Sequence, residues 1–295
     1  TFIREFSELK INFKRTILNP AQLFIASFLV IIFIGALLLM LPNATHEGIS
    51  LVDALFTSTS AVCVTGLVVV DTGSYFTEFG QLIIMFLIQT GGLGILTFAS
   101  YFSYFFKGGA TYENQLVLSD MTSSKKLSEV FSILKYVILI TFSIELISAI
   151  LIYFSLDAGQ FESQYDLFFF SVFHAVSAFC NAGFSTLSNS LYEESYRFNY
   201  YLQLIIIFTF IIGGLGFPIV VNLLKFLKYK IRKLLAFSKV NYRPWVLNLN
   251  SRITLITTFS LTLGALVIFY FTEYNNTLAE HNGFGKIVTA LFGAA

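Results

Sequence analysis

The sequence predicts an all-α polytopic membrane protein that is organised as tandem repeats. Its 295 residues are 56% hydrophobic and only 12% charged, whereas charged residues make up about a quarter of an ordinary soluble domain. The apolar residues come in long runs separated by short polar stretches, which is typical of several membrane spans. A segment near residue 60 also recurs near residue 177 in the same context. A soluble, lipid-binding helical protein is the alternative, and this pattern disfavours it.

Several apolar runs are long enough to cross a hydrocarbon core, which takes about 20 helical residues. These predicted spans are 21–41, 80–106, 130–155, 200–224 and 251–271. Two less hydrophobic pieces, 50–63 and 164–180, follow the first and third runs and are too short to span. We expect each of them to form a short amphipathic helix.

Basic residues lie mostly at one end of the predicted spans. All of the 18 Lys and Arg except Arg197 and Lys286 precede the first span or lie in or beside segments 107–128 and 225–250. By the positive-inside rule, the N-terminus and both segments are then cytoplasmic, so the two short pieces enter and return on the outer side. Acidic residues on that outer side would concentrate cations at a mouth, although ordinary solvated loops explain them equally well. They are Asp71, Glu78, Asp157, Glu162, Asp166, Glu193 and Glu194.

An internal duplication is the strongest organisational signal. Ser60–Leu67 recurs as Ser177–Phe184, and Gln81–Gly94 recurs as Gln203–Gly216. Each copy has the order span, short helix, glycine-containing strand, span. A unit with two spans returns the chain to its starting side, so the copies run in parallel, as around an axis along the membrane normal.

A third copy starts near residue 251, and the counterpart of its glycine strand would lie beyond Ala295. We therefore interpret the sequence as a fragment. The expected segments are a cytoplasmic N-terminal segment (1–18), a first repeat (19–106), a cytoplasmic loop (107–128), a second repeat (129–224), a basic cytoplasmic loop (225–250) and the start of a third repeat (251–295).

The two short helices have recognisable starts. Ser50 with Asp53, and Ser163 with Asp166, fit the capping-box pattern, with an acidic residue in the first turn. The spacing from there to the glycine strand predicts that the second helix is about one turn longer. A helix that enters from outside points the partial negative charge of its C-terminus towards the membrane centre, which favours a cation that has shed its water.

Irregular backbone follows each short helix at membrane depth, where it is tolerated only if protein covers it or it lines water. Gly66 and Gly183 would let the backbone approach an ion closely and permit positive φ, so that carbonyls turn inward. A tight re-entrant turn without ligands is the alternative, which the duplication disfavours. Together these features predict a cation pore.

Other candidate residues give weaker signals. The Gly-Gly-Leu-Gly tracts in the second spans favour close helix packing or a kink over gating. Cys63 and Cys180 occupy the same slot in the two copies and are expected to be buried thiols that pack a short helix. His174 is interpreted as structural, and Glu145, inside a span, is either functional or bonded to a neighbouring helix. No nucleotide, hydrolytic or metal-site motif stands out, so no enzyme is expected.

Five motifs carry a family resemblance. They are Gly35–Pro42, Asp53–Phe56, Cys63–Leu67, Gln89–Gly94 and Cys180–Phe184. Through them, from about residue 17 to the end, the sequence resembles the membrane subunit of Ktr-type bacterial potassium uptake systems, within the Trk/Ktr/HKT superfamily. The resemblance implies a potassium-channel-like fold of four span–pore-loop–span repeats around one pore, of which this chain holds about two and a half.

The resemblance also implies the site. Backbone carbonyls would form a pseudo-fourfold selectivity filter for potassium, the transported ion, with no covalently bound cofactor. The residues concerned are Val64, Thr65, Gly66, Asn181, Ala182 and Gly183. In plant relatives, serine at the position of Gly66 accompanies sodium preference, so the glycine here favours potassium.

Partners and location follow in the same way. The resemblance implies a homodimer in the bacterial cytoplasmic membrane on a ring of nucleotide-binding regulatory subunits, with 107–128 and 225–250 as contacts, and no nucleic acid. Sodium dependence stays open.

Two other functions remain as alternatives to a potassium pore. They are a secondary ion-coupled transporter with re-entrant loops and inverted repeats, and a non-conducting half-protein that assembles in trans.

Overall fold

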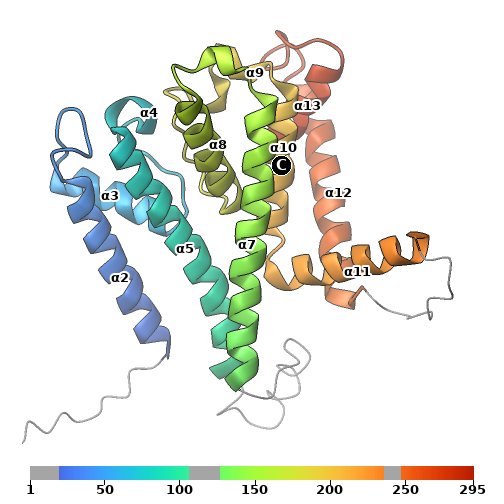
Figure 1. Cartoon of the computed structure of the whole chain (residues 1–295). Helices are drawn as coiled ribbons and strands as arrows, with labels where there is room; N and C mark the ends of the chain where they lie inside the picture. Colours follow the sequence, from blue (N-terminus) through green and yellow to red (C-terminus); the bar gives the residue numbers. More distant parts are fainter. Residues whose placement is uncertain (1–19, 106–126, 236–246) are drawn as a thin grey trace, which may run out of the picture.

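The computed structural model describes residues 20–105, 127–235 and 247–295 (Figure 1). In that part of the chain every regular element is a helix, and Thr45 and Phe76 form an isolated β-bridge. The expectation of an all-α chain is therefore confirmed. The predicted loop 107–128 and N-terminal segment 1–18 lie almost wholly outside the described residues.

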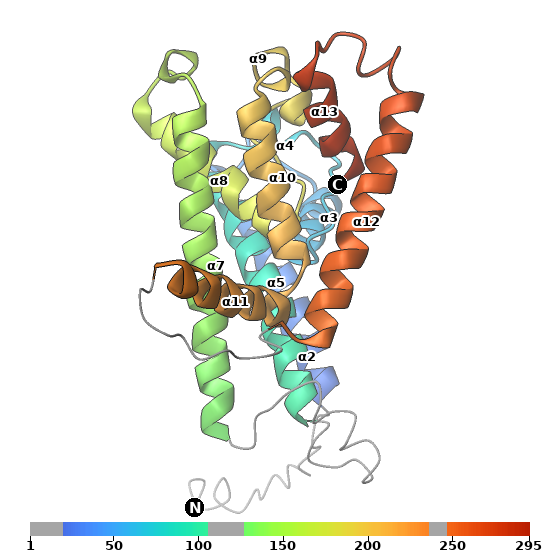
Figure 2. The ribbon, with the colours of Figure 1, turned by 90° about the vertical axis from the view of Figure 1, so that its right-hand side faces the viewer.

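Long helices lie alongside one another and form the body of the molecule (Figures 1 and 2). They are α2 (Pro20–Leu39), α5 (Glu78–Phe105), α7 (Leu127–Ser155), α10 (Tyr200–Gly214) and α12 (Leu249–Thr272). Shorter helices lie in the upper half of the bundle, namely α3 (Leu51–Val62), α8 (Gln164–Phe179) and α13 (Phe284–Ala294). One helix, α11 (Phe217–Leu235), runs across the others. Single turns connect the elements at the upper end: α4 (Thr72–Tyr75), η2 (Ala158–Gln160), η3 (Ser190–Tyr192) and α9 (Glu194–Arg197).

Each short helix packs against the long helix that precedes it in the chain. Helix α3 contacts α2 and then α5, and α8 contacts α7 and then α10, while α13 contacts α12 and α10. Helix α5 also contacts α7 and α8. The buried core around α2, α3 and α5 accordingly extends to α8 and the segment after it, because Phe173 of α8 and the following Ala182 and Phe184 belong to it.

Small and hydroxylated residues let these helices approach closely. The Ser58 hydroxyl donates to the Ile32 carbonyl at 2.8 Å, and a Cβ on Gly35 would lie 2.4 Å from the Ser58 oxygen. Ser148 and Thr209 join α7 to α10 through a buried 2.8 Å hydrogen bond. Such contacts are typical of helices that associate in lipid, where apolar surface alone gives little drive for one helix to prefer another.

The predicted helix starts are present, with one difference. Ser163 and Asp166 form a full capping box at α8. At α3, the Ser50 side chain accepts a hydrogen bond from the Asp53 backbone amide. The Asp53 carboxylate accepts from the Ser50 hydroxyl at 2.7 Å, not from the Ser50 backbone amide as in a full capping box. Helix α3 has 12 residues and α8 has 16, which confirms the extra turn expected in the second short helix.

The prediction of one continuous span over 200–224 is wrong. Helix α10 ends at Gly214, and the chain bends by 112° before α11. Gly216 between them has φ +79°, a conformation that glycine adopts without steric cost, and Pro218 lies in the first turn of α11, where a missing N–H is tolerated. The segment 225–250 is consequently not all loop, since α11 continues to Leu235.

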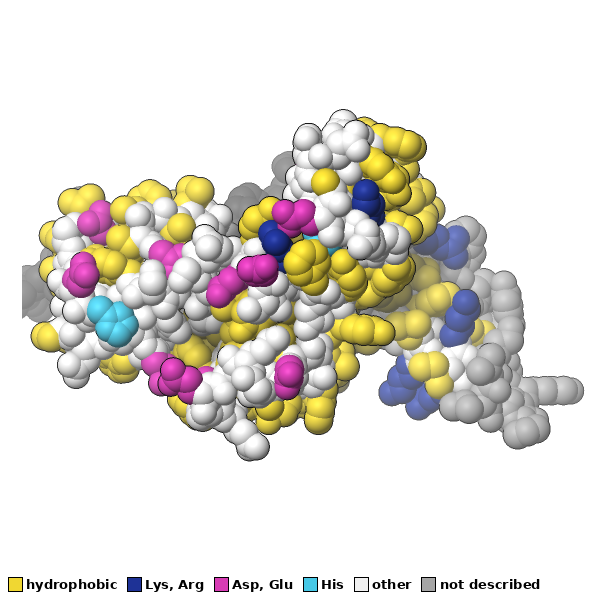
Figure 3. All heavy atoms as spheres, turned by 90° about the horizontal axis from the view of Figure 1, so that it is seen from above, with side chains coloured by type: hydrophobic (Ala, Val, Ile, Leu, Met, Phe, Trp, Pro, Cys, Tyr) yellow, Lys and Arg dark blue, Asp and Glu magenta, His cyan; other side chains and the backbone are white. Residues whose placement is uncertain are grey.

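By length and composition, two of the described helical segments can each cross a membrane: Lys135–Ser155 and Leu249–Thr272. The bent pair of α10 and α11 would add a third. Seen from above, acidic side chains are spread over the upper face, while a cluster of basic ones lies to one side, on the more distant α11 (Figure 3).

Candidate functional site

The residues that follow α3 and α8 form the candidate site. We call residues 63–67 the first junction and residues 180–184 the second junction. Cys63 and Cys180 cap the helices, and each junction then turns back along the helix that it leaves.

Both helices end in a Schellman motif. In the first junction, the Thr65 amide donates to the Ser60 carbonyl at 2.9 Å and the Val64 amide to the Ala61 carbonyl at 3.2 Å. These are the six-to-one and five-to-two bonds of that motif, whose central residue is left-handed and usually glycine. The residue in that place here is Val64, with φ +57°.

The second junction repeats this arrangement bond for bond. The Ala182 amide donates to the Ser177 carbonyl at 2.8 Å, and the Asn181 amide donates to the Ala178 carbonyl at 3.0 Å. Asn181 takes the left-handed position with φ +58°. Asparagine tolerates this conformation, whereas a β-branched residue is a genuine outlier there. The strain at Val64 is of the kind that clusters at functional sites.

The sign of φ alternates along each junction. Val64 and Gly66 have φ +57° and +73°, and Asn181 and Gly183 have φ +58° and +74°. Thr65 and Ala182, between them, are not among the described residues with positive φ. Alternation between left- and right-handed backbone turns successive peptide planes so that their carbonyls can point to one side instead of to opposite sides.

The backbone amides of the two residues after each helix cap are hydrogen-bonded, whereas the carbonyls of the same residues have no such bond within the described part of the chain. The amides described above are used by the helix ends, while the carbonyls of Val64, Thr65, Asn181 and Ala182 accept no hydrogen bond from any described residue. The C-terminal ends of α3 and α8 also carry partial negative charge, about half an elementary charge each. Both features make the junctions an electronegative backbone surface.

The two junctions lie against each other. A Cβ on Gly66 would lie 2.4 Å from the Ala182 carbonyl oxygen, and a Cβ on Gly183 would lie 3.7 Å from the Gly66 Cα. The fold therefore brings together the six residues that the sequence singles out, although they come from distant parts of the chain.

Side chains of α8 hold the second junction in place. The Ser177 hydroxyl donates to the Phe184 carbonyl at 2.6 Å. The buried His174 ring contacts the Phe170 carbonyl and the Ser185 hydroxyl, both at 2.9 Å. Both ring nitrogens are thus occupied by protein groups, which supports the structural role expected for this histidine.

The Asn181 side chain has a role that the sequence did not indicate. With its amide oriented as its neighbours require, it donates to the Phe210 carbonyl at 3.0 Å and accepts from the Gly214 amide at 3.2 Å. These two groups pair with each other in a regular helix. Asn181 therefore ties the second junction to the end of α10, immediately before the bend. Locally, the sequence indicates only that asparagine suits a left-handed turn, and it does not indicate the contact of the Asn181 side chain with α10.

The Gly-Gly-Leu-Gly tracts pack against the short helices, in agreement with the packing role favoured for them. A Cβ on Gly91 would lie 2.0 Å from the Val62 carbonyl oxygen, and one on Gly213 would lie 1.9 Å from that of Phe179. In both cases the contact is with the last residue of a short helix. The first glycine of each tract thus positions a junction.

The expectation that both thiols are buried is wrong for one of them. Cys180 is half-buried and packs against α5, where a Cβ on Gly92 would lie 2.6 Å from its sulfur. Cys63 is exposed, and no described glycine approaches it in this way. The shared slot sets the capping position, whereas burial depends on which helix lies alongside.

Glu145 is buried in α7 with a relative exposure of 5%. It faces Gln89 of α5, but neither its carboxylate oxygens nor the Gln89 amide have a hydrogen-bond partner in the described part of the chain. Among the described residues, Glu145 thus faces a polar side chain of the neighbouring helix without a hydrogen bond of normal geometry.

We expect Glu145→Gln to keep the fold and to raise the free energy of unfolding by about 1 kcal/mol, because an unpaired buried carboxylate costs more than a neutral amide of the same size. Thermal unfolding of the purified protein in detergent measures the effect. The paired Ser148→Ala, which removes one half of a formed hydrogen bond, should lower stability instead. A clear loss of stability in Glu145→Gln would contradict this account.

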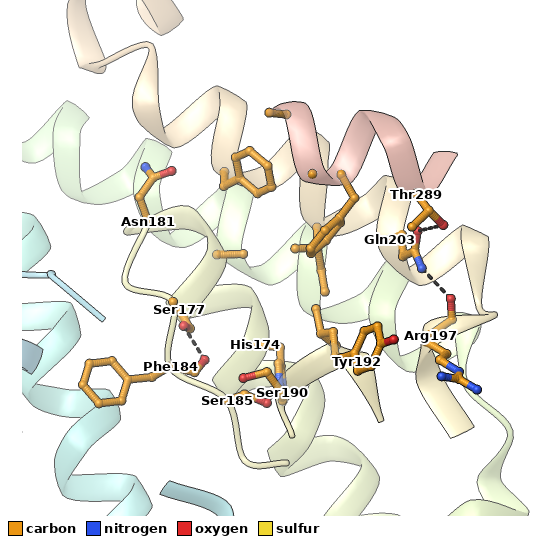
Figure 4. A pocket seen from close by; sticks show the side chains of 18 of the residues that line it. His174, Ser177, Asn181, Phe184, Ser185, Ser190, Tyr192, Arg197, Gln203 and Thr289 are labelled. Atoms are coloured by element: carbon orange, nitrogen blue, oxygen red, sulfur yellow. Dashed lines mark hydrogen bonds between the residues drawn. The ribbon is translucent and has the colours of Figure 1, made fainter. Parts of the chain in front are cut away.

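A cavity of about 570 Å³ adjoins the second junction. Ser177 and Asn181 line one side, and Gln203 and Thr289 line another (Figure 4), while Gly183 also lines it. Most of its walls come from α8, α10 and α13, and no residue of the first junction lines it.

The chain matches a family model along nearly its whole length. Residues 4–295 match the TrkH family, described as cation transport protein. It is 37% identical over 278 residues to the Ktr system potassium uptake protein B of Bacillus subtilis (strain 168), covering 94% of this chain and 58% of that protein. It is also 34% identical over 262 residues to the potassium/sodium uptake protein NtpJ of Enterococcus hirae, covering 88% of this chain and 53% of that protein. The chain thus spans little more than half the length of these relatives.

Among solved structures, the potassium transporter TrkH from Vibrio parahaemolyticus matches with a TM-score of 0.34 and 15% identity, over 95% of this chain and 84% of that one. The family assignment rests on the sequence matches, which cover most of the chain. They confirm the family resemblance. The chain belongs to the TrkH family of cation transport proteins.

Proposed function

We propose that this protein carries potassium into the bacterial cell through a filter to which both junctions contribute backbone carbonyls. One observation carries the proposal. The two junctions have the same helix ending, the same alternation of φ and the same unused carbonyls, and they meet at Gly66 and Gly183. Two matched electronegative strands at one place suit a single cation better than two unrelated turns would.

Potassium fits this chemistry because carbonyl oxygens can replace its hydration shell. The junction amides do not occupy the junction carbonyls, because those of Val64, Thr65, Asn181 and Ala182 donate to carbonyls of the helix ends. The negative ends of α3 and α8 lower the cost of bringing a cation to the membrane interior. No bond is made or broken, and the ion moves down its electrochemical gradient.

A ring of carbonyls needs more strands than these two. In the proposal, the two span–short helix–span units are parallel repeats around one axis, and four such strands surround the ion. The N-terminus is cytoplasmic, and the protein works as a homodimer with a cytoplasmic ring of nucleotide-binding subunits. The relatives named for potassium uptake and for potassium/sodium uptake support the substrate class, and sodium is the competing ion.

Replacing Gly66 with serine tests the proposal. We expect the ratio of potassium to sodium flux to fall about tenfold, because the residue has φ +73° and its Cβ would displace the Ala182 carbonyl, a cost of about 1–2 kcal/mol at a single ligand position. The assay is cation flux into proteoliposomes that contain the protein expressed from its gene, supported by growth of a potassium-uptake-deficient host.

Gly48→Ser is the matched control. Gly48 has φ +81°, and a Cβ added there would have no atom within 4 Å, so the residue carries the same backbone penalty away from the junctions. Its selectivity should equal that of the parent protein. Unchanged selectivity in Gly66→Ser, or an equal change in both variants, would count against the filter.

A further inference from the structure

Helix α11 has a face that nothing in the described structure covers. Leu224, Leu227 and Ile231 are 45%, 43% and 54% exposed, and their spacing of three and four residues places them on one side of the helix. This apolar stripe lies on a helix that runs across the bundle, not along it (Figure 2).

Cations flank the stripe. Lys225, Lys228, Lys230 and Arg232 are all exposed or partly exposed, and the sequence from Phe217 to Thr272 contains no Asp or Glu. The long side chains can extend their charged ends away from an apolar layer while their stems stay in it. The combination of an apolar stripe and a basic face is typical of a helix that lies in the plane of a membrane interface.

The position of α11 in the molecule agrees with a place at the membrane interface. The Asn248 amide, one residue before α12 begins, donates to the Asn222 side-chain oxygen of α11 at 3.1 Å. Helix α11 is therefore held close to the end of a helix that is long enough to cross the membrane. The acidic side chains lie on the upper face of the molecule (Figure 3), whereas α11 crosses the bundle well below that face (Figures 1 and 2).

We propose that α11 lies in the headgroup layer of the membrane and binds anionic phospholipid through Lys225, Lys228 and Arg232. Bacterial anionic lipids supply the negative charge that this acid-free segment lacks, and each cation near such a surface contributes about 1 kcal/mol to the attraction. The bend after Gly214 places α11 in this layer, because a straight continuation of α10 would point the basic face out of it.

The test uses the protein purified in a neutral detergent without other subunits. It is titrated with phosphatidylglycerol, and the bound lipid molecules are counted by native mass spectrometry. We expect phosphatidylglycerol to bind more tightly than phosphatidylcholine. The combined variant Lys225→Gln, Lys228→Gln, Arg232→Gln should weaken phosphatidylglycerol binding about 100-fold and leave phosphatidylcholine binding unchanged. Inorganic phosphate should not compete, because it lacks the acyl chains that the stripe would contact.

Single variants provide a matched comparison. Lys228→Gln should weaken binding about fivefold, whereas Lys286→Gln, which removes a cation from the opposite end beside the Tyr274 ring, should have no effect. Leu227→Ser should also weaken binding. Equal affinity for both lipids, equal effects of Lys228→Gln and Lys286→Gln, or full competition by inorganic phosphate would overturn the proposal. Retention of the lipid only when a second protein is added would assign the surface to that protein instead.

Discussion

Gly213→Ala is expected to destabilise the protein by about 3 kcal/mol or more and to abolish cation transport. An added Cβ would lie 1.9 Å from the Phe179 carbonyl oxygen, whereas ordinary contact begins at 3.4 Å. The atom that it meets is backbone at the end of α8, so no side chain can rotate away. Helix α10 would have to move from α8, and the second junction would lose its support.

Gly264→Ala is the control for this prediction. Gly264 lies inside α12, where a Cβ would meet nothing within 4 Å. Alanine is favoured over glycine inside a helix by up to about 1 kcal/mol, so this variant should be as stable as the parent protein or more so. Thermal unfolding in detergent and cation flux in proteoliposomes measure both variants. Similar stabilities for the two would refute the packing role of Gly213.

Gly66→Ala should impair potassium flux more than Gly183→Ala. Both residues have positive φ, at +73° and +74°, which costs an alanine about 1–2 kcal/mol. They differ in their surroundings, since a Cβ on Gly66 would lie 2.4 Å from the Ala182 oxygen, whereas one on Gly183 would be in ordinary contact at 3.7 Å. Only the first substitution adds a steric clash, which costs about a further 1–3 kcal/mol.

Flux of potassium and sodium into proteoliposomes separates the two variants. Gly183→Ala should keep measurable, potassium-selective flux, while Gly66→Ala should lose at least about ten times more of it, as a difference of about 1.4 kcal/mol or greater implies. Gly48→Ala, with the same backbone penalty and open surroundings, controls for general loss of stability. Equal losses in Gly66→Ala and Gly183→Ala would show that the junctions do not meet as described.

Much of the fold could be predicted from local sequence. Long apolar runs predicted the long helices, because a membrane span requires about 20 apolar residues, although the run 200–224 forms a bent pair. The starts of α3 and α8 could be predicted because Ser50 and Ser163 bond within one turn. Gly66 and Gly183 stood out because the surrounding octapeptides are duplicated. None of these signals depends on distant parts of the chain.

The endings of α3 and α8 could not be predicted in the same way. A Schellman motif is usually announced by glycine in its left-handed position, and that position holds Val64 in one junction and Asn181 in the other. The Asn181 side chain is used by α10, about 30 residues further on. Such contacts exist only after the helices have packed.

The sequence by itself determined that this is a helical membrane protein with a glycine after each of two short helices, because hydropathy and helix caps act over a few residues. The arrangement in repeated units stays a prediction from the duplicated motifs. Only the tertiary structure decided whether each Gly-Gly-Leu-Gly tract continues its helix or bends the chain. In α5 the tract stays helical, with Gly94 against the Phe28 ring of α2, while after α10 Gly216 has φ +79° and open surroundings. The same four residues continue one helix and bend the chain at another, where Pro218 follows the tract and the neighbouring helices differ.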